Sequence, residues 1–213
     1  MINSFLYISG GCVKTLWIFT LTCSISFIIS IIFLRIVFLK PNWHWGIKIY
    51  IWCFRGLPLL LQILIGSLLL NRYIPLGDFW WCILVLGCNS AAYLTSIFWD
   101  GFNTIPCSYL ETIKILDLGE RIGFKKVIMP LVLHNTINAR NGEFTTLLKD
   151  TSMLSIFGVC EIIFRAKEIS YQTYDFFTPL CLAGLLFLLI NLFREKYTDL
   201  LLRGIYKCLL FLF

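Results

Sequence analysis

Five long apolar stretches, separated by polar segments, dominate the pattern of this chain. They cover about residues 15–38, 49–70, 79–99, 142–163 and 176–193. A helix needs about 20 mostly apolar residues to cross the hydrocarbon core of a bilayer. The pattern therefore predicts an all-α integral membrane protein with about five transmembrane helices, in a single domain that covers residues 1–213.

Two of these stretches are interrupted by polar residues. The second contains Arg55 and Pro58, and the fourth contains Lys149 and Asp150. Proline breaks or bends a helix, and a charge at the centre of a spanning helix costs about 2.5–3.5 kcal/mol, so such charges usually face a cavity or each other. We expect an irregular fourth segment, preceded by a partly buried helix.

The composition agrees with a membrane protein. Hydrophobic residues make up 59% of the chain and charged residues only 14%. A soluble domain exposes more charge, and a β-barrel would show short alternating strands in place of long apolar runs. The nine cysteines are scattered singly without a CxxC pair, and the two histidines are far apart. We therefore expect neither disulfides nor a metal site.

Basic residues fall unequally on the two sides that five spans would create. One side would hold Lys14, Arg72, Arg165 and Lys167. The other would hold Arg35, Lys40, Lys48, Lys114, Arg121, Lys125, Lys126, Arg140, Arg194, Lys196, Arg203 and Lys207. Because cytoplasmic loops are rich in Lys and Arg, this count places the loop at residues 103–130 and the C-terminus in the cytoplasm, and the N-terminus outside.

The polar loop at residues 103–130 contains a short amphipathic pattern. Leu110, Ile113 and Leu116 recur at helical spacing, whereas Glu111 and Lys114 project elsewhere. Such a helix could insert its apolar side into a groove of a partner protein. Periodicity alone favours the alternative, an ordinary connecting loop that rests on the membrane surface.

The polar residues of the two interrupted stretches suggest a transport path. We hypothesise that Arg55 and Gln62 face Lys149 and Asp150 across it, because an amino acid needs one donor-rich and one acceptor-rich patch. The alternative is structural, with Lys149 pairing with Asp150 or a backbone carbonyl. Pro58 is equally explained as a residue that only ends or bends a helix.

A series of motifs covers nearly the whole chain, from about residue 10 to 194. It includes RGLPLLLQ at 55–62, the loop from Glu111 to Pro130, and LLKDTS at 147–152, followed by Gly158 and Glu161. In this order and spacing, the motifs resemble the permease subunit of polar-amino-acid ABC importers of the histidine/glutamine/arginine type.

The resemblance implies a type I ABC-importer permease fold with a cytoplasmic coupling helix. It also implies three kinds of partner: a cytoplasmic ABC ATPase dimer, a second permease copy or a sister permease, and a periplasmic or tethered amino-acid-binding protein. The permease itself would perform no catalysis and bind no cofactor, since ATP and Mg would lie on the ATPase. The chain lacks a GxxxxGK[ST] pattern, as this division of labour requires.

The resemblance also implies roles for individual residues. ATPase coupling would involve Glu111, Thr112, Ile113, Asp117, Gly119 and Pro130. The substrate pathway would involve Arg55, Pro58, Gln62, Ser96, Lys149, Asp150, Thr151 and Ser152. The coupling motif departs from the family's Glu-Ala-Ala, and Asp117 replaces its turn glycine, so we expect Gly119 to serve the turn instead. Pro130 is equally explained as a residue that only ends or bends a helix.

The predicted function is ATP-driven import of a polar amino acid across the bacterial inner membrane by alternating access. A basic amino acid is the first expectation, because residues 89–93 and 173–175 resemble arginine-type permeases. An integral-membrane enzyme would need a cluster of His, Asp or Glu at one interface. An ion-coupled secondary transporter usually needs more spans or inverted repeats. Whether the permease pairs with itself or with a sister stays open.

Overall fold

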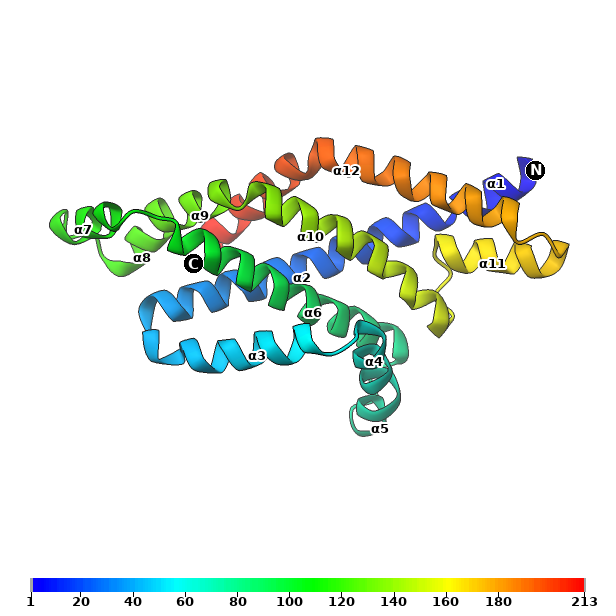
Figure 1. The fold of residues 1–213 in the computed structure, drawn as a ribbon, viewed down its shortest axis with the longest axis horizontal. Coiled ribbons are helices and arrows are strands. Elements are labelled where there is room, and N and C mark those ends of the chain that lie inside the picture. Colours follow the sequence, from blue (N-terminus) through cyan, green and yellow to red (C-terminus); the bar gives the residue numbers. More distant parts are fainter. Residues whose placement is uncertain (1, 213) are drawn as a thin grey trace.

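The structure is a computed structural model that describes the backbone of residues 2–212 and the side-chain environment of residues 5–40 and 42–196. Helices and turns, without a strand, make up this part of the chain. The long helices lie roughly along one axis and form an elongated bundle (Figure 1). The all-helical architecture predicted from the apolar stretches is confirmed.

The first apolar stretch forms a long, nearly continuous helix. Helix α1 (Ile2–Ser9) leads into α2 (Gly11–Leu39) through Gly10, whose backbone stays helical with φ −59° and ψ −20°. Together they contain an apolar helix of 35 residues, Phe5–Leu39. The helical segment therefore begins well before the expected start at residue 15.

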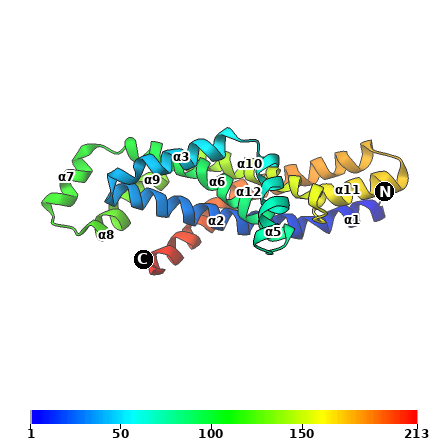
Figure 2. The same cartoon turned by 90° about the horizontal axis from the view of Figure 1, so that it is seen from below.

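The second apolar stretch is sharply bent. Helix α3 (His44–Gly56) ends before Pro58, and α4 (Leu59–Leu64), a π-helical turn (Ile65–Leu70) and α5 (Asn71–Tyr73) follow in a new direction. The two parts meet at an angle of 103°. The α4–α5 arm (Leu59–Tyr73) therefore projects sideways from the bundle (Figure 1), and Figure 2 shows it nearly end-on.

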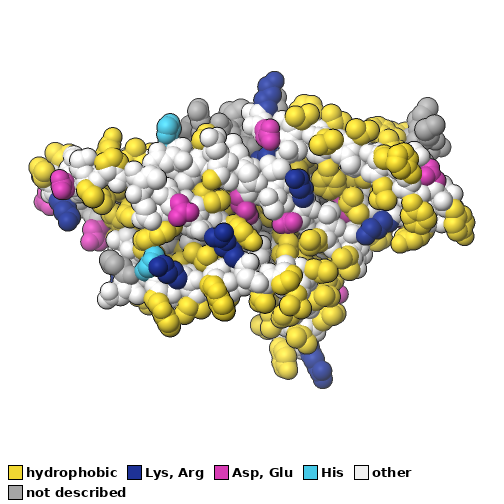
Figure 3. All heavy atoms as spheres, in the orientation of Figure 1, with side chains coloured by type: hydrophobic (Ala, Val, Ile, Leu, Met, Phe, Trp, Pro, Cys, Tyr) yellow, Lys and Arg dark blue, Asp and Glu magenta, His cyan; other side chains and the backbone are white. Residues whose placement is uncertain are grey.

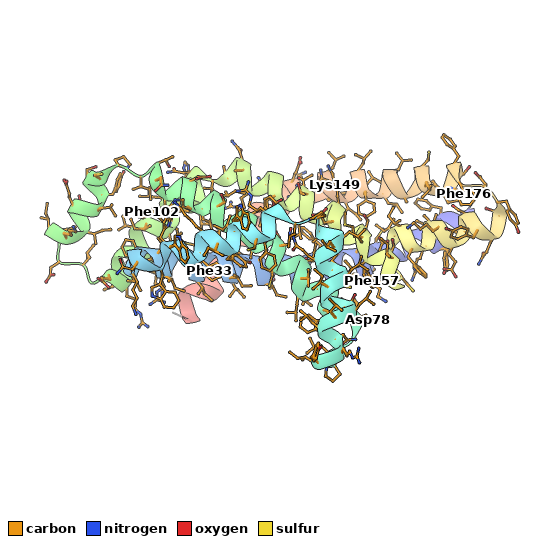
Figure 4. The ribbon with its side chains drawn as sticks, turned by 60° about the horizontal axis from the view of Figure 1, so that its bottom comes forward. Phe33, Asp78, Phe102, Lys149, Phe157 and Phe176 are labelled. Carbon is orange, nitrogen blue, oxygen red and sulfur yellow. The ribbon has the colours of Figure 1, made fainter. Side chains whose placement is uncertain are left out.

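The α4–α5 arm is tied to the start of α6 near its outer end and is apolar on its surface. Asn71 donates a hydrogen bond to Asp78, the first residue of α6, with 3.0 Å between Nδ2 and Oδ1 (Figure 4). Hydrophobic side chains cover most of the arm (Figure 3), and Leu68 and Leu69 are more than half exposed. Such a surface suits lipid or another membrane helix.

Helix α6 (Asp78–Asn103) packs along α2 and forms the centre of the bundle. The interface is rich in small residues, which let helix backbones approach closely. Thr22 and Ser26 of α2, and Ala91 and Ala92 of α6, are fully buried. The hydroxyl groups of Thr22 and Ser26 donate to carbonyls of their own helix, so they introduce no unpaired polar group.

The polar loop contains two short helices, α7 (Cys107–Ile115) and α8 (Glu120–Gly123). A π-helical turn (Phe124–Ile128) and α9 (Met129–Asn135) lead from them to α10 (Ile137–Asp150). Helices α7 and α8 lie at one end of the bundle, and the N-terminus lies at the other (Figure 1).

The segment expected at residues 142–163 is divided among three elements. Helix α10 ends at Asp150, a 3₁₀ helix covers Thr151–Phe157, and α11 (Ile162–Thr173) begins after a break. Gly158 sits in the break with φ +72°, a left-handed conformation that ends a helix and that glycine adopts easily. Glu161 is buried and caps α11, because its Oε1 accepts a hydrogen bond from the Phe164 amide at 2.8 Å.

The last helix, α12 (Phe177–Leu212), is longer than the expected 176–193. Asp175 caps its start by accepting hydrogen bonds from the amides of Phe177 and Thr178 at 3.0 and 3.2 Å. Hydrogen bonds from the Thr178 side chain and from these amides lower the pKa of Asp175, because they stabilise its carboxylate.

Three helices of the described residues are long and apolar enough to cross a membrane: Phe5–Leu39, Asp78–Asn103 and Phe177–Lys196. The bent pair His44–Gly56 and Leu59–Tyr73 would make a fourth if it counts as one span. By length and composition, the described helices give three or four candidate spans, and the predicted count of about five stays a prediction. The expected fourth span is not among them because α10 and α11 are separated by the break at Gly158.

A close contact near the N-terminal end of the bundle gives a stability prediction. A Cβ atom on Gly11 would lie 2.8 Å from the backbone nitrogen of Ile162, whereas one on Gly184 would meet nothing within 4 Å. Overpacking of this kind costs about 1–3 kcal/mol. We expect Gly11→Ala to lower the melting temperature of the detergent-solubilised protein by several degrees.

Gly184→Ala is the matched control, since alanine in an open helical position gains about 1 kcal/mol over glycine. It should leave the melting temperature unchanged or raise it. An equal response of the two variants would show that α2 does not depend on close contact with the start of α11.

Candidate functional site

The break between α3 and α4 is stabilised by two side-chain amides. Pro58 interrupts the helix, so nearby backbone carbonyls lose their helical partners. The Gln62 amide nitrogen donates to the carbonyls of Phe54 at 2.7 Å and Leu57 at 2.8 Å. Asn89 of α6 donates to the Phe54 carbonyl and to the Gln62 side-chain oxygen, both at 3.1 Å. These bonds hold the bend against α6.

Arg55 is placed beside this break by the last turn of α3. Its Nη1 donates to the hydroxyl of Ser96 at 3.0 Å. Its guanidinium carbon lies 4.9 Å from the centre of the Tyr93 ring, a distance at which a cation and an aromatic ring attract each other. Tyr93 and Ser96 are three residues apart on α6 and so share one face of that helix.

A cavity of about 290 Å³, which we call the polar hollow, opens at this point. It lies where α3, α4, α6 and α10 meet. Its lining consists of Arg55, Gly56, Leu57, Pro58, Leu59, Asn89, Tyr93, Glu143, Thr146 and Asp150. Acidic and basic side chains are close together on this face of the bundle (Figure 3). The polar hollow thus combines one guanidinium with two carboxyl groups.

The two carboxyl groups come from one helix face. Glu143 and Asp150 are seven residues apart on α10, with Thr146 between them, which is the spacing of residues that line up along a helix. Ser90 of α6 donates to Glu143 Oε1 at 2.7 Å and orients it. This arrangement can accept positively charged groups on the α10 side and a carboxylate at Arg55.

The polar loop forms a compact tip, which we call the coupling segment (Cys107–Gly123). Helix α7 ends in a Schellman motif: the amides of Leu118 and Asp117 donate to the carbonyls of Ile113 and Lys114, both at 3.1 Å. Asp117 has φ +46°, whereas Gly119 has φ −51°. Asp117 itself therefore takes the left-handed turn position expected of Gly119. Aspartate tolerates this conformation better than most residues.

The coupling segment is held together by a close helix contact and exposes the rest of its surface. Ile113 is buried, and its Cγ2 atom is so close to Gly123 that a Cβ there would lie 2.7 Å away. In contrast, Ile115 is 81% exposed and Leu116 is 61% exposed. Glu111, Thr112, Asp117, Gly119 and Pro130 are also exposed. Apart from Ile113, the residues predicted for coupling can therefore meet a partner.

A known protein family matches most of this chain. A family model described as "Binding-protein-dependent transport system inner membrane component" matches residues 25–206. The chain belongs to this family. The predicted identity as an ABC-importer permease is confirmed, and the protein is a transport subunit of the inner membrane.

Curated relatives of this permease are permeases as well. The arginine transport system permease protein ArtQ of Bacillus subtilis (strain 168) is 28% identical over 190 residues, which cover 87% of this chain and 86% of ArtQ. The octopine transport system permease protein OccM of Rhizobium radiobacter is 27% identical over 164 residues, covering 72% of this chain and 67% of OccM.

A solved structure shares the fold of this permease. It is a crystal structure of an amino acid ABC transporter with histidines, with a TM-score of 0.79 and 22% identity over 96% of each chain. The predicted type I permease fold is thereby confirmed.

The predicted pathway residues divide into two groups. Arg55, Pro58 and Asp150 line the polar hollow, and Ser96 is hydrogen-bonded to Arg55. Gln62 stabilises the bend behind the hollow. Lys149 (Figure 4) is exposed. Thr151 is buried, and its hydroxyl donates to the Leu148 carbonyl. Lys149, Thr151 and Ser152 do not line the polar hollow. A pathway role for the permease's residues stays a prediction.

Sequence reasoning missed Glu143 in this permease. It lies one residue inside the expected 142–163 stretch, so a search of that stretch for every charge, and not only for Lys149 and Asp150, would have found it. In the sequence, Asn89 and Tyr93 stand out only within residues 89–93, which resemble arginine-type permeases. Within the described residues, no group of three His, Cys, Asp or Glu side chains could hold a metal ion.

The bend of this permease gives a second stability prediction. Gln62→Met keeps the size of the side chain but leaves the Leu57 carbonyl without its hydrogen bond. It also removes the bonds of Gln62 to the Phe54 carbonyl and from the Asn89 amide. Each hydrogen bond contributes about 0.5–1.5 kcal/mol, so the melting temperature should fall by several degrees.

Ser67→Ala is the control on the same arm. The Ser67 hydroxyl is buried without a hydrogen-bond partner, so its removal leaves nothing unpaired. That variant should be as stable as the wild type. A Gln62→Met protein with unchanged stability would mean that the bend does not depend on this amide.

Proposed function

We propose that this permease is the membrane subunit of an ATP-driven importer that moves a polar amino acid across the bacterial inner membrane by alternating access. The observation that supports it most is the polar hollow, in which Glu143 and Asp150 face the same cavity as Arg55. A basic amino acid carries two positive groups and one carboxylate, which is the complement of these three side chains. The relatives named for arginine and octopine transport agree with this choice.

In the proposed binding mode, the guanidinium of Arg55 receives the substrate α-carboxylate. The α-amino group and the cationic side chain bind at Glu143 and Asp150. These residues lie about one turn of α10 before and after Thr146. Ser90 and Ser96 hold the carboxyl and guanidinium groups in place through their hydroxyls. Binding is non-covalent throughout, and the permease performs no chemical step.

The coupling segment is the proposed contact with a separate ATPase dimer. Ile115 and Leu116 are apolar yet exposed at the tip of the segment, which suits insertion into a groove of a soluble partner. ATP and Mg would be bound by that ATPase. The chain's lack of a GxxxxGK[ST] pattern supports this division.

The proposed topology places the coupling segment and the C-terminus in the cytoplasm. The coupling segment and the N-terminus lie at opposite ends of the bundle (Figure 1), which supports an external N-terminus. The excess of Lys and Arg in the loop and tail supports the same orientation. A binding protein would deliver the amino acid at the outer end, and a second permease copy or a sister permease would complete the membrane unit.

The substrate proposal is tested by uptake of radiolabelled arginine and glutamine into proteoliposomes that contain the complete importer. Glu143→Gln removes one negative charge from the polar hollow but keeps its shape. A hydrogen bond to a charged group contributes about 1.5–3 kcal/mol, so the apparent affinity for arginine should fall about 10- to 100-fold.

Asp100→Asn serves as the control, since Asp100 is exposed on α6 and lines none of the described cavities. It should transport arginine as the wild type does. Normal arginine affinity in Glu143→Gln, with normal protein levels, would rule out this carboxyl group as a ligand of the substrate.

The coupling proposal is tested by co-purification of the ATPase and by ATP hydrolysis in lipid. Ile115→Asp places a charge in the proposed interface without disturbing a buried contact, and Glu111→Lys reverses a charge on the same helix. We expect both to lower ATPase retention and stimulated hydrolysis at least tenfold, a loss of about 1.4 kcal/mol or more in binding.

Tyr171→Asp alters an aromatic residue on α11 that is also largely exposed, at the opposite end of the bundle. ATPase retention should be normal in this variant. Full retention in Ile115→Asp and Glu111→Lys as well would show that the coupling segment is only a connector.

A further inference from the structure

Three cavities follow one another from the middle of the bundle to the coupling segment, and each shares lining residues with the next. The polar hollow shares Arg55 and Gly56 with a groove of about 640 Å³ that runs along α3. We call this the α3 groove. At its other end, it shares Val37, His44 and Trp99 with a cavity of about 860 Å³ beneath the coupling segment.

The α3 groove lies between three helices of the same chain. Phe33 of α2 (Figure 4), Ile51 of α3 and Thr95 of α6 are among its lining residues. The rings of His44 and Trp99 lie at its end nearer the coupling segment, with 4.4 Å between their centres. A small molecule could therefore pass from the polar hollow to the coupling end within one permease subunit.

Among its described lining residues, the α3 groove offers no acidic site that would retain a cation. Lys48 and Arg55 line the α3 groove, and none of the described residues that line it has a carboxylate. A basic amino acid that leaves Glu143 and Asp150 would therefore meet no second acidic site there. The lining of the α3 groove is otherwise mostly apolar.

Gly56 stands where the polar hollow joins the α3 groove. It is the last residue of α3, and a Cβ atom there would meet nothing within 4 Å. Its backbone is not left-handed, because Gly77 and Gly158 are the glycines with positive φ among the described residues. Glycine in a helix costs about 1 kcal/mol relative to alanine, so neither backbone geometry nor crowding explains its presence.

We propose that the transported amino acid leaves the polar hollow through the α3 groove, and that Gly56 determines the width of this exit. The missing side chain keeps the junction open. Larger residues at position 56 would fold normally and project into the route. This proposal rests on the proposed function, since it assigns an exit to the substrate of the polar hollow.

The test is a size series, Gly56→Ala, Gly56→Val and Gly56→Trp, in the complete importer. Two quantities are measured: equilibrium binding of radiolabelled arginine to the detergent-solubilised importer, and arginine uptake into proteoliposomes. Uptake should fall stepwise with side-chain size, by at least tenfold for Gly56→Trp, which corresponds to about 1.4 kcal/mol in the barrier. Because Gly56 also lines the polar hollow, uptake is compared at saturating arginine, so that a slower exit is separated from a change in binding affinity.

Gly46 provides matched controls on the same helix. It is exposed on α3, a Cβ atom there would also meet nothing within 4 Å, and it lines none of the three cavities. Gly46→Ala, Gly46→Val and Gly46→Trp should bind and transport as the wild type does.

The outcomes separate this proposal from the proposed function. Wild-type uptake in Gly56→Trp, or an equal loss in the Gly46 series, would overturn the exit through the α3 groove while leaving the substrate assignment intact. A wild-type importer that neither binds nor transports an amino acid would instead overturn the proposed function. Should Gly56→Trp fail to reach the membrane, the Ala and Val variants decide: stepwise loss of uptake supports the exit, and unchanged uptake refutes it.

Discussion

Backbone groups that leave a helix inside a membrane must find partners within the protein, because the hydrocarbon core contains no water to replace them. This constraint governs the region around Pro58. The helix ends there, and Gln62 and Asn89 supply the donors that its carbonyls need. The sharp bend that results turns the α4–α5 arm out of the bundle and leaves Arg55 and Gly56 at the edge of the polar hollow. Without these amide bonds, the hollow would have no fixed wall on the α3 side.

The coupling segment is connected to the polar hollow through continuous helical structure. From Glu120 the chain passes through the π-helical turn and α9 into α10, which contributes Glu143 and Asp150. Two tight contacts stiffen this route: Gly123 lies against Ile113, and a Cβ on Gly101 of α6 would lie 2.3 Å from the Thr136 side chain. A rigid element displaced at one end moves at the other. Movement of the coupling segment can therefore reach the carboxyl groups of the hollow without any intervening flexible loop.

Sequence reasoning could single out residues that conflict with their surroundings. Arg55 and Pro58 are unfavourable in an apolar helix, and both line the polar hollow. Sequence reasoning located the ends of helices less well. The fourth stretch was placed at 142–163, whereas its helix ends at Asp150 and a 3₁₀ helix follows. Glu143 therefore looked like a boundary residue and was overlooked. Gly119 was expected at the turn because glycine favours left-handed backbone, yet the hydrogen bonds of the Schellman motif place Asp117 there.

The sequence by itself determined that the chain is a helical membrane protein, and its ordered motifs indicated the permease family. Apolar length and charge content are properties of single segments, so they can be read without knowing which segments touch. Only the tertiary structure decided that Asp150 and Glu143 share a cavity with Arg55 while Lys149 does not, and that Gln62 supports the bend. Such choices depend on the direction in which each side chain leaves its helix and on the angle between helices. Neither is set locally, because both follow from how α3, α6 and α10 pack against one another.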